Sequence, residues 1–177
     1  MKPANPNTAA QQTQRGKMAS CVAFAKSLVG PVFNAYTDKF QKSMSGFNYF
    51  IKQNIAEFDG SVDYSALKVT EGKLYPLQSL LANYDHTDGG LVITWDEAIG
   101  NNGALTDAVY WALHDTDSGL WYFADAEVTR DDEGDSQTIP LSLTYSDLEL
   151  YAWAVQMSGT LVSLISDSAH ATCTEGP

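Results

Sequence analysis

The spacing of the apolar residues changes once along this chain of 177 residues, at Asp59 and Gly60, and this change limits the possible folds more than any other feature. Before it, apolar residues recur at intervals of three and four, as on one face of an amphipathic helix. After it, short runs alternate apolar and polar residues between clusters of Gly, Asp and Asn, which is typical of strands joined by turns. The sequence therefore predicts an α+β protein, with an N-terminal helical arm at residues 1–60 and a β-sandwich at residues 61–177.

The arm is predicted to contain two or three helices. The first begins after Thr8, because residues 8–11 have the Thr-x-x-Gln spacing of a capping box, and it ends at Gly30 and Pro31. The second begins at Pro31, and Gly46 predicts a break in it near residues 43–46. Its apolar stripe is rich in aromatic rings and comprises Phe33, Tyr36, Phe40, Met44, Phe47, Ile51 and Ile55. Either this stripe packs within the chain, or part of it docks on another subunit.

Seven runs after residue 60 are predicted as strands, and they cover residues 66–70, 91–95, 108–114, 120–124, 138–143, 148–157 and 160–166. A further segment, residues 78–84, fits either a strand or a helical turn. Residues 115–119 have the composition of a turn, and Ser158 and Gly159 are predicted to form a two-residue turn. Short antiparallel strands with turns at intervals of roughly eight to twelve residues predict an immunoglobulin-like or fibronectin-like sandwich. The likeness is one of architecture, since the chain lacks the cysteine pair of antibody domains.

Charge is divided unevenly between the two parts of the chain. Up to Phe58 there are seven basic and two acidic residues, a formal net charge of +5. The remainder holds three basic and twenty acidic residues, a net charge of −17, so that the whole chain carries −12. This division predicts that the basic arm contacts an acidic surface. It argues against nucleic acid as a partner of the acidic part, because phosphate contacts require clustered Lys and Arg.

Composition also limits the cellular compartment in which the protein is expected. No run of eighteen apolar residues is present, and the first residues lack the apolar segment of a secretory signal, so neither membrane insertion nor secretion is predicted. The chain has two cysteines, too few for a disulfide framework, which fits a reduced cytoplasmic origin.

No catalytic motif is found, and the chain is predicted not to be an enzyme. The acidic run at residues 131–135 lacks the ligand spacing of a calcium loop and is interpreted as a solvated hairpin loop. Cys21 is interpreted as a small core residue and His114 as a solvated or capping residue at a strand end. No metal-ligand spacing joins the three histidines, which are His86, His114 and His170. Neither a catalytic residue nor a cofactor or metal site is therefore predicted.

Aromatic residues form a second feature of the predicted sandwich. Residues 121–123 are three consecutive rings, so at least one of them faces outward. Tyr151 and Trp153 share one face of their strand. Such rings can bind a sugar or a neighbouring subunit, and they can equally pack in the core.

The N-terminal sequence carries a resemblance. Residues 5–18, NPNTAAQQTQRGKM, follow the pattern N-P-x-T-x-A-Q-x-x-x-R-x-x-F/M. Later marks are NYF at 48–50, DYS at 63–65, EGKL at 71–74 and VITWD at 92–96. The chain resembles a bacterial and phage family, domain of unknown function 6266. This resemblance implies a helical arm, a sandwich and a bacterial or bacteriophage setting, and it carries no catalytic residues across.

Two classes of function are expected. The first is a non-enzymatic structural protein of a bacteriophage virion (capsid, head–tail or tail accessory), made in the host cytoplasm, whose arm contacts protein subunits, possibly copies of itself. The second is a carbohydrate- or ligand-binding sandwich of a bacterial cell, located in the cytoplasm. The residues expected to make the subunit contact are Arg15, Lys17, Lys26, Phe33, Tyr36, Phe40 and Phe47.

Overall fold

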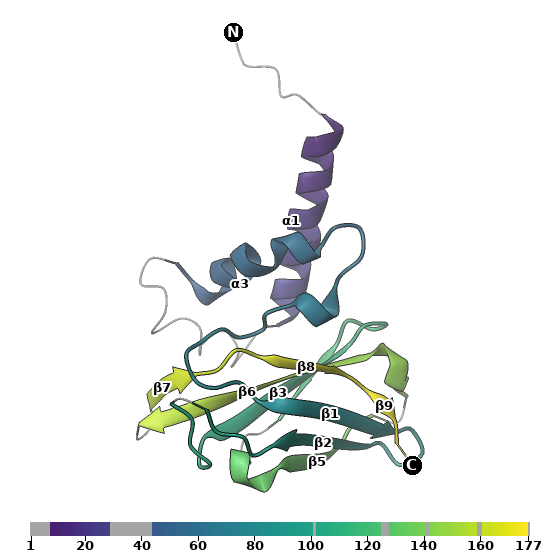
Figure 1. Ribbon diagram of the computed structural model, residues 1–177. Coiled ribbons are helices and arrows are strands. Elements are labelled where there is room, and N and C mark those ends of the chain that lie inside the picture. The colour runs from purple at the N-terminus through teal and green to yellow at the C-terminus, as the bar shows by residue number, and fades with distance from the viewer. Residues whose placement is uncertain are drawn as a thin grey trace. The chain divides into compact units, whose positions relative to one another are not determined.

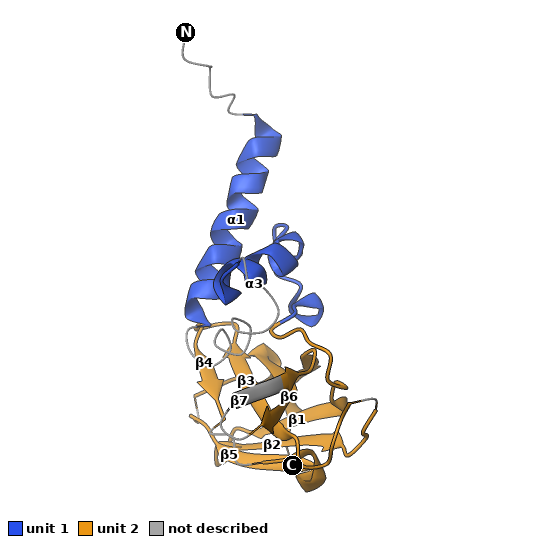
Figure 2. Ribbon diagram, turned by 90° about the vertical axis from the view of Figure 1, so that its left-hand side faces the viewer, with its two compact units in different colours: residues 1–68 blue, residues 69–177 orange. Residues whose placement is uncertain are grey.

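The protein is described by a computed structural model that defines residues 8–28, 44–100, 102–124, 128–140, 142–158 and 161–176. It divides into two compact units, Met1–Lys68 and Val69–Pro177 (Figure 2). The division lies at Lys68, later than the change of sequence pattern at Asp59 and Gly60. Asn54 explains the difference, because its buried side chain binds the backbone of Lys68 in both directions. Its amide nitrogen donates to the carbonyl oxygen at 3.0 Å, and its oxygen accepts from the N–H at 2.7 Å.

The helical unit contains α1 (Ala9–Ser27), α3 (Gly46–Asn54) and two 3₁₀ turns, η1 (Ile55–Glu57) and η2 (Tyr64–Ala66) (Figure 1). Thr8 caps α1 as predicted, since its hydroxyl accepts from the N–H of Gln11 at 3.3 Å. The reciprocal half of the predicted capping box is not made, because the side-chain oxygen of Gln11 is buried without a hydrogen-bond partner. Helix α3 starts at Gly46, within the region of the predicted break, and Ser45 caps it; the earlier part of the predicted second helix, before Met44, lies outside the described residues. The predicted stop at Gly30 and Pro31 lies outside the described residues.

Aromatic rings fill the centre of the helical unit. The ring of Phe24 lies 6.0 Å from that of Phe50 and 5.5 Å from that of Phe58, measured between centroids. Cys21 is fully buried beside them, as predicted for a core residue. Burial raises the pKa of its thiol to about 11, so the thiol stays protonated and unreactive at neutral pH.

The second unit is a sandwich of two sheets (Figure 1). The first sheet has the order β5 (Gly134–Thr138), β2 (Gly90–Asp96), β1 (Gln78–Asp85) and β9 (Thr174–Glu175). The second has the order β4 (Trp121–Phe123), β3 (Ala108–Asp115), β6 (Leu148–Ser158) and β7 (Leu161–Ile165), with β8 (Ala169–Thr172) also paired to β6. All pairs are antiparallel except β1 with β9. The chain changes sheet after β2, after β4, after β5 and after β8, so the architecture is the predicted immunoglobulin-like or fibronectin-like sandwich.

The core of the sandwich lies between the inward faces of both sheets. Its central members are Leu80, Ala82, Tyr84, Leu91, Ile93, Trp95, Val109, Trp111, Leu113, Leu148, Leu150, Ala152 and Ala154. Polar atoms that enter this core are satisfied. The Tyr84 hydroxyl donates to the carbonyl of Pro140 at 2.6 Å, and the Trp95 indole donates to the carbonyl of Arg130 at 3.2 Å.

Two predicted strands are wrong. At residues 66–70 there is no strand, because the N–H groups of Val69 and Thr70 bind the hydroxyl of Ser168 in place of a neighbouring strand. The predicted strand at 138–143 is also wrong, because β5 covers Gly134–Thr138 and ends where the predicted strand begins. β5 starts inside the acidic run that was interpreted as a hairpin loop. The ambiguous segment 78–84 is a strand, β1. Neither β8 nor β9 is predicted by the sequence, since both are short and lack a clear apolar alternation.

A buried ion pair that sequence reasoning missed holds the loops at one end of the sandwich. Arg130 and Asp107 are 0% and 2% exposed, and Nε of the arginine lies 3.2 Å from a carboxylate oxygen of the aspartate. The guanidinium also donates to the carbonyls of Tyr75 and Ala98, and the same carboxylate accepts from the N–H of Ala104. Burial lowers the pKa of Arg130, and the carboxylate of Asp107 opposes this effect.

The sheet formed by β4, β3, β6 and β7 is apolar on both faces. On the face turned away from the core, the rings of Tyr110 and Trp153 stack at 6.3 Å, and the ring of His114 lies 4.5 Å from that of Trp121. His114 is 3% exposed, so its interpretation as a solvated or capping residue is wrong. The strand continues to Asp115 and keeps His114 within the ladder. Burial lowers the pKa of His114 to about 4, an effect that Asp115 partly opposes.

Asp107→Asn should destabilise the protein strongly, because it leaves the guanidinium of Arg130 buried without its charge partner. The expected loss in free energy of unfolding is about 3–5 kcal/mol. Urea unfolding measures it, and Asp131→Asn, at an exposed neighbouring position, should change stability by less than about 0.5 kcal/mol. Equal effects of the two substitutions would show that the buried pair has no special role.

Stability should also fall between pH 7 and pH 5 because of His114. The unfolded state binds a proton near the ordinary pKa of about 6.5, whereas the folded state does not until about pH 4. Acidification therefore favours unfolding, by about 2 kcal/mol over this range. Urea unfolding at several pH values should show a smaller pH slope for His114→Gln than for the unmodified protein. An unchanged slope in His114→Gln would contradict the assignment.

Candidate functional site

Four of the seven residues predicted to make a subunit contact lie among the described residues of the helical unit. Arg15, Lys17 and Lys26 lie on α1, and Phe47 lies half-buried on α3. Arg15 and Lys26 are exposed, whereas Nζ of Lys17 lies 2.8 Å from a carboxylate oxygen of Asp59 within the same unit. The other three predicted residues, Phe33, Tyr36 and Phe40, lie outside the described residues.

The first half of α1 is largely exposed. From Thr8 to Ser20 every residue is exposed except Gln11 and Lys17, which are half-buried. Met18 is 43% exposed, a high value for a large apolar side chain. The helix carries three basic residues and no acidic one. A helix segment of this length gains little stability by itself, so its exposed face is suited to a partner surface.

A small groove runs beside this helix. It has a volume of about 300 Å³ and is lined by Thr13, Gly16, Lys17, Ser20, Phe58, Asp59 and Gly60. Its lining residues have small or polar side chains, apart from the ring of Phe58. Lys17 and Asp59, which form an ion pair, are both lining residues. Hydroxyl, ammonium and carboxylate groups of this kind suit packing or hydrogen bonding.

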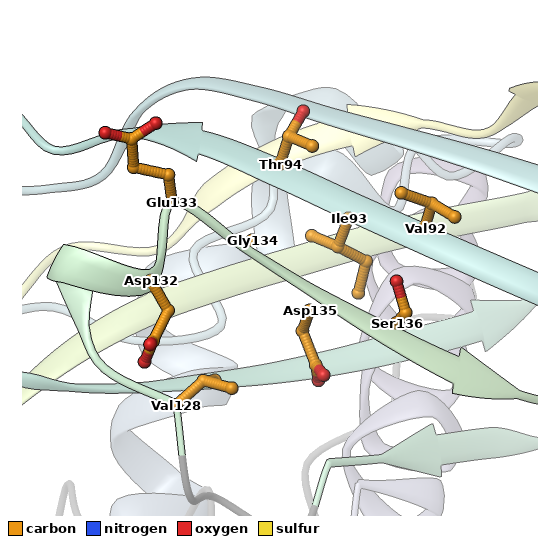
Figure 3. Close-up of a pocket in the computed structure, with 9 residues that line it drawn as sticks. All are labelled: Val92, Ile93, Thr94, Val128, Asp132, Glu133, Gly134, Asp135 and Ser136. Atoms are coloured by element: carbon orange, nitrogen blue, oxygen red, sulfur yellow. The ribbon is translucent and has the colours of Figure 1, made fainter.

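The acidic run lies at a hollow of about 480 Å³ beside β5 (Figure 3). Asp132, Asp135 and Val128 lie on one side of β5, and Glu133 and Thr94 lie on the other (Figure 3). The carboxylates of Asp132 and Asp135 accept hydrogen bonds within the sandwich unit. Asp132 accepts from the N–H of Thr129 at 2.6 Å, and Asp135 accepts from the indole of Trp111 at 2.8 Å. The run is thus a 3₁₀ turn, η3 (Arg130–Asp132), followed by the start of β5, and the prediction of a hairpin loop is corrected.

The solvent face of the first sheet carries an apolar centre. Leu81 on β1 and Val92 on β2 are 60% and 43% exposed. Thr94 is paired with Leu81 across the strands, and Ser136 with Val92. We call these four residues the β1–β2 patch. Leu91, Ile93 and Trp95 alternate along β2 and are buried, so Val92 between them points away from the core, whereas the ambiguity of residues 78–84 in the sequence concealed Leu81.

Acidic residues border the β1–β2 patch. Asp96 follows Thr94 by two positions on the same face of β2, and Glu133 lies on the same side as Thr94 (Figure 3); both acids are exposed. The sandwich unit contains two basic residues, and one of these, Arg130, is fully buried. Lys73 is the other and is exposed, so the surface of this unit is strongly negative.

The histidines do not come together. His170 lies 2.6 Å from a carboxylate oxygen of Glu149, between β8 and β6, and His86 lies 3.9 Å from Glu175 at an exposed turn. His114 is buried elsewhere on β3. Among the residues that the structure defines, no group of three His, Cys, Asp or Glu side chains is placed to hold a metal ion.

The aromatic rings are covered more than a binding platform would be. Tyr151 and Trp153 are 0% and 3% exposed, while Trp121 and Phe123 are half-buried and stack at 6.2 Å. Tyr122 packs against the sandwich core.

Neither of the described α-helices is long and apolar enough to cross a membrane.

Comparison with solved structures finds a distant likeness. A protein titled "The crystal structure of a Fn3-like protein from Clostridium thermocellum" is 16% identical, with a TM-score of 0.36, and the match covers 59% of this chain and 95% of that one. No curated protein sequence matches the chain significantly.

The helical unit and most of the sandwich match one family together. Residues 1–166 fit the sequence pattern described as "Family of unknown function (DUF6266)". The match takes in the two described α-helices and strands β1 to β7 and ends before β8 and β9. The chain therefore belongs to this family of unknown function, in agreement with the resemblance carried by its N-terminal motif.

Proposed function

We propose that this protein is a non-enzymatic structural component of a larger assembly, in which the helical unit contacts neighbouring protein subunits. The observation that carries the proposal is the first half of α1, which is exposed, basic and without acidic residues. A bacteriophage virion is the assembly we propose, because the N-terminal motif resembles a bacterial and phage family. The protein would then be made in the host cytoplasm and reside in the particle.

Charge and apolar burial have different parts in such a contact. An arm of +5 and a remainder of −17 attract one another across subunits, which raises the rate of encounter and sets orientation. Each exposed ion pair adds only about 0–1 kcal/mol, and 0.1 M salt screens it beyond about 10 Å. Apolar side chains such as Met18 must therefore supply most of the binding free energy.

A carbohydrate- or ligand-binding module of a bacterial cell is the second candidate. The half-buried rings of Trp121 and Phe123, which are inclined by 17° to each other, are the observation that favours it. The burial of Tyr151 and Trp153 removes two of the rings that such a platform would use. The assembly role is supported better for this reason.

Removal of residues 1–17 should abolish assembly, because it deletes most of the exposed half of α1. Light scattering of the full-length and truncated proteins, alone and with the native partner, measures the change at low and high salt. Arg15→Glu should weaken assembly about five-fold, equivalent to about 1 kcal/mol, and Gln14→Glu is the matched control because it adds the same carboxylate without removing the base.

Two results would contradict the assembly role. One is equal assembly of truncated and full-length protein, and the other is a monomeric state of both in the presence of the native partner. The ligand-binding module would then be the better interpretation.

A further inference from the structure

A stripe along α1 has both apolar and basic character. Gln11, Arg15 and Met18 follow one another at helical intervals of four and three, so they share one face of the helix. Arg15 and Met18 are exposed, and Met18 is the exposed large apolar residue of this helix. The buried residues Cys21 and Ala25 belong to the part of the helix that follows.

The β1–β2 patch has the complementary character. Leu81 pairs with Thr94 and Val92 pairs with Asn83, so the two apolar side chains are diagonal neighbours on adjacent strands. Uncharged Thr94 and Ser136 extend the patch, and the exposed acids Asp96 and Glu133 lie at one end of it.

Similar surfaces repel one another in this protein. Two α1 helices would bring basic residues together, because neither contains an acid. Two sandwich units would bring negative surfaces together, because Lys73 is the one basic residue of this unit that is not buried. Electrostatic attraction is therefore expected only between the α1 helix of one copy and the sandwich unit of another.

We infer that the α1 stripe of one copy docks on the β1–β2 patch of a second copy, an inference that rests on the assembly role proposed above. Met18 packs on Leu81 and Val92. Arg15, one helical turn away, then lies toward the acidic end of the patch, since Asp96 is only about 7 Å beyond Thr94 along the strand.

A contact between two different surfaces has a consequence for symmetry. Each copy offers one helix and one patch, so each can bind two neighbours in a head-to-tail manner. Such a contact gives a ring if the rotation closes and a filament if it does not. Salt should weaken the contact, because part of the attraction is between exposed charges.

Complementation between two variants tests this arrangement. The helix variant is Arg15→Glu with Met18→Ser, and the patch variant is Leu81→Lys with Val92→Lys. Sedimentation velocity at low salt should show assembly of the unmodified chain and at least a tenfold weaker assembly of each variant alone. An equimolar mixture should give a dimer and nothing larger, because one intact helix and one intact patch then occur in each pair.

Controls separate this contact from general effects. Leu120→Lys changes an apolar residue that is 57% exposed but lies outside the patch, and it should leave assembly unchanged. Urea unfolding checks that each variant folds. If the patch variant does not fold, Thr94→Lys, on the same face of β2, takes its place.

Three results would overturn the inference, and each bears differently on the assembly role. If only the helix variant loses assembly, the helix contacts another surface and the assembly role stands. If both variants lose assembly and their mixture does not recover it, the contact is not between helix and patch. If the unmodified chain is monomeric at low salt, copies of this chain are not the partner, and the assembly role then depends on the native partner alone.

Discussion

The guanidinium of Arg130 is the group on which the sandwich unit depends most. It is fully buried and binds Asp107 together with the carbonyls of Tyr75 and Ala98, so segments before β1, after β2 and before β3 meet at one side chain. Such a pair is costly to break because the remaining charge would be buried alone. Its position also removes one of the two basic residues of this unit from the surface. The same interaction that fixes the loops therefore leaves the exterior negative.

The edges of the first sheet are poorly suited to pairing with another chain. β5 is polar throughout, and Asp135 points inward from it to accept a hydrogen bond from Trp111. Inward-pointing charge on an edge strand discourages the addition of a further strand. At the opposite edge, β9 covers Asn83 and Tyr84 of β1. Association through the face of this sheet is thus easier than association through its edges, which agrees with an exposed Leu81 and Val92 on that face.

The sequence was sufficient to predict the architecture because apolar periodicity reflects burial directly. The helical starts after Thr8 and at Gly46 depend on local capping, and long strands such as β6 follow from alternation. Failures occurred where distant residues decide the structure. Ser168 binds the backbone at Val69 from almost a hundred positions away, and no local pattern reveals that contact.

The candidate site was harder to predict because the recognisable motifs are structural. In the EGKL segment, a side chain at Gly72 would collide with the carbonyl oxygen of Ile165, since a Cβ there would lie at 1.8 Å. In the VITWD segment, Trp95 is buried and binds the carbonyl of Arg130. Of the residues proposed to face a partner, Met18 closes the N-terminal motif, which does not reveal its exposure, and Leu81 belongs to no motif. Their importance depends on exposure, which becomes visible only in three dimensions.

The helix α1 is held firmly at one end and extends from that anchor. Phe24 packs in the aromatic centre of its unit, and Cys21 and Ala25 are buried, whereas the residues from Thr8 to Gly16 are exposed apart from half-buried Gln11. The anchored turns remove the cost of helix nucleation, so Thr8 and the following residues of high helix propensity extend an existing helix. Gly16, at the junction, weakens the extension by about 1 kcal/mol relative to alanine. A partner that covers the stripe would stabilise these first turns without having to fold them. Because the binding surface is already formed, less conformational entropy is lost on docking, and a modest apolar contact around Met18 can suffice.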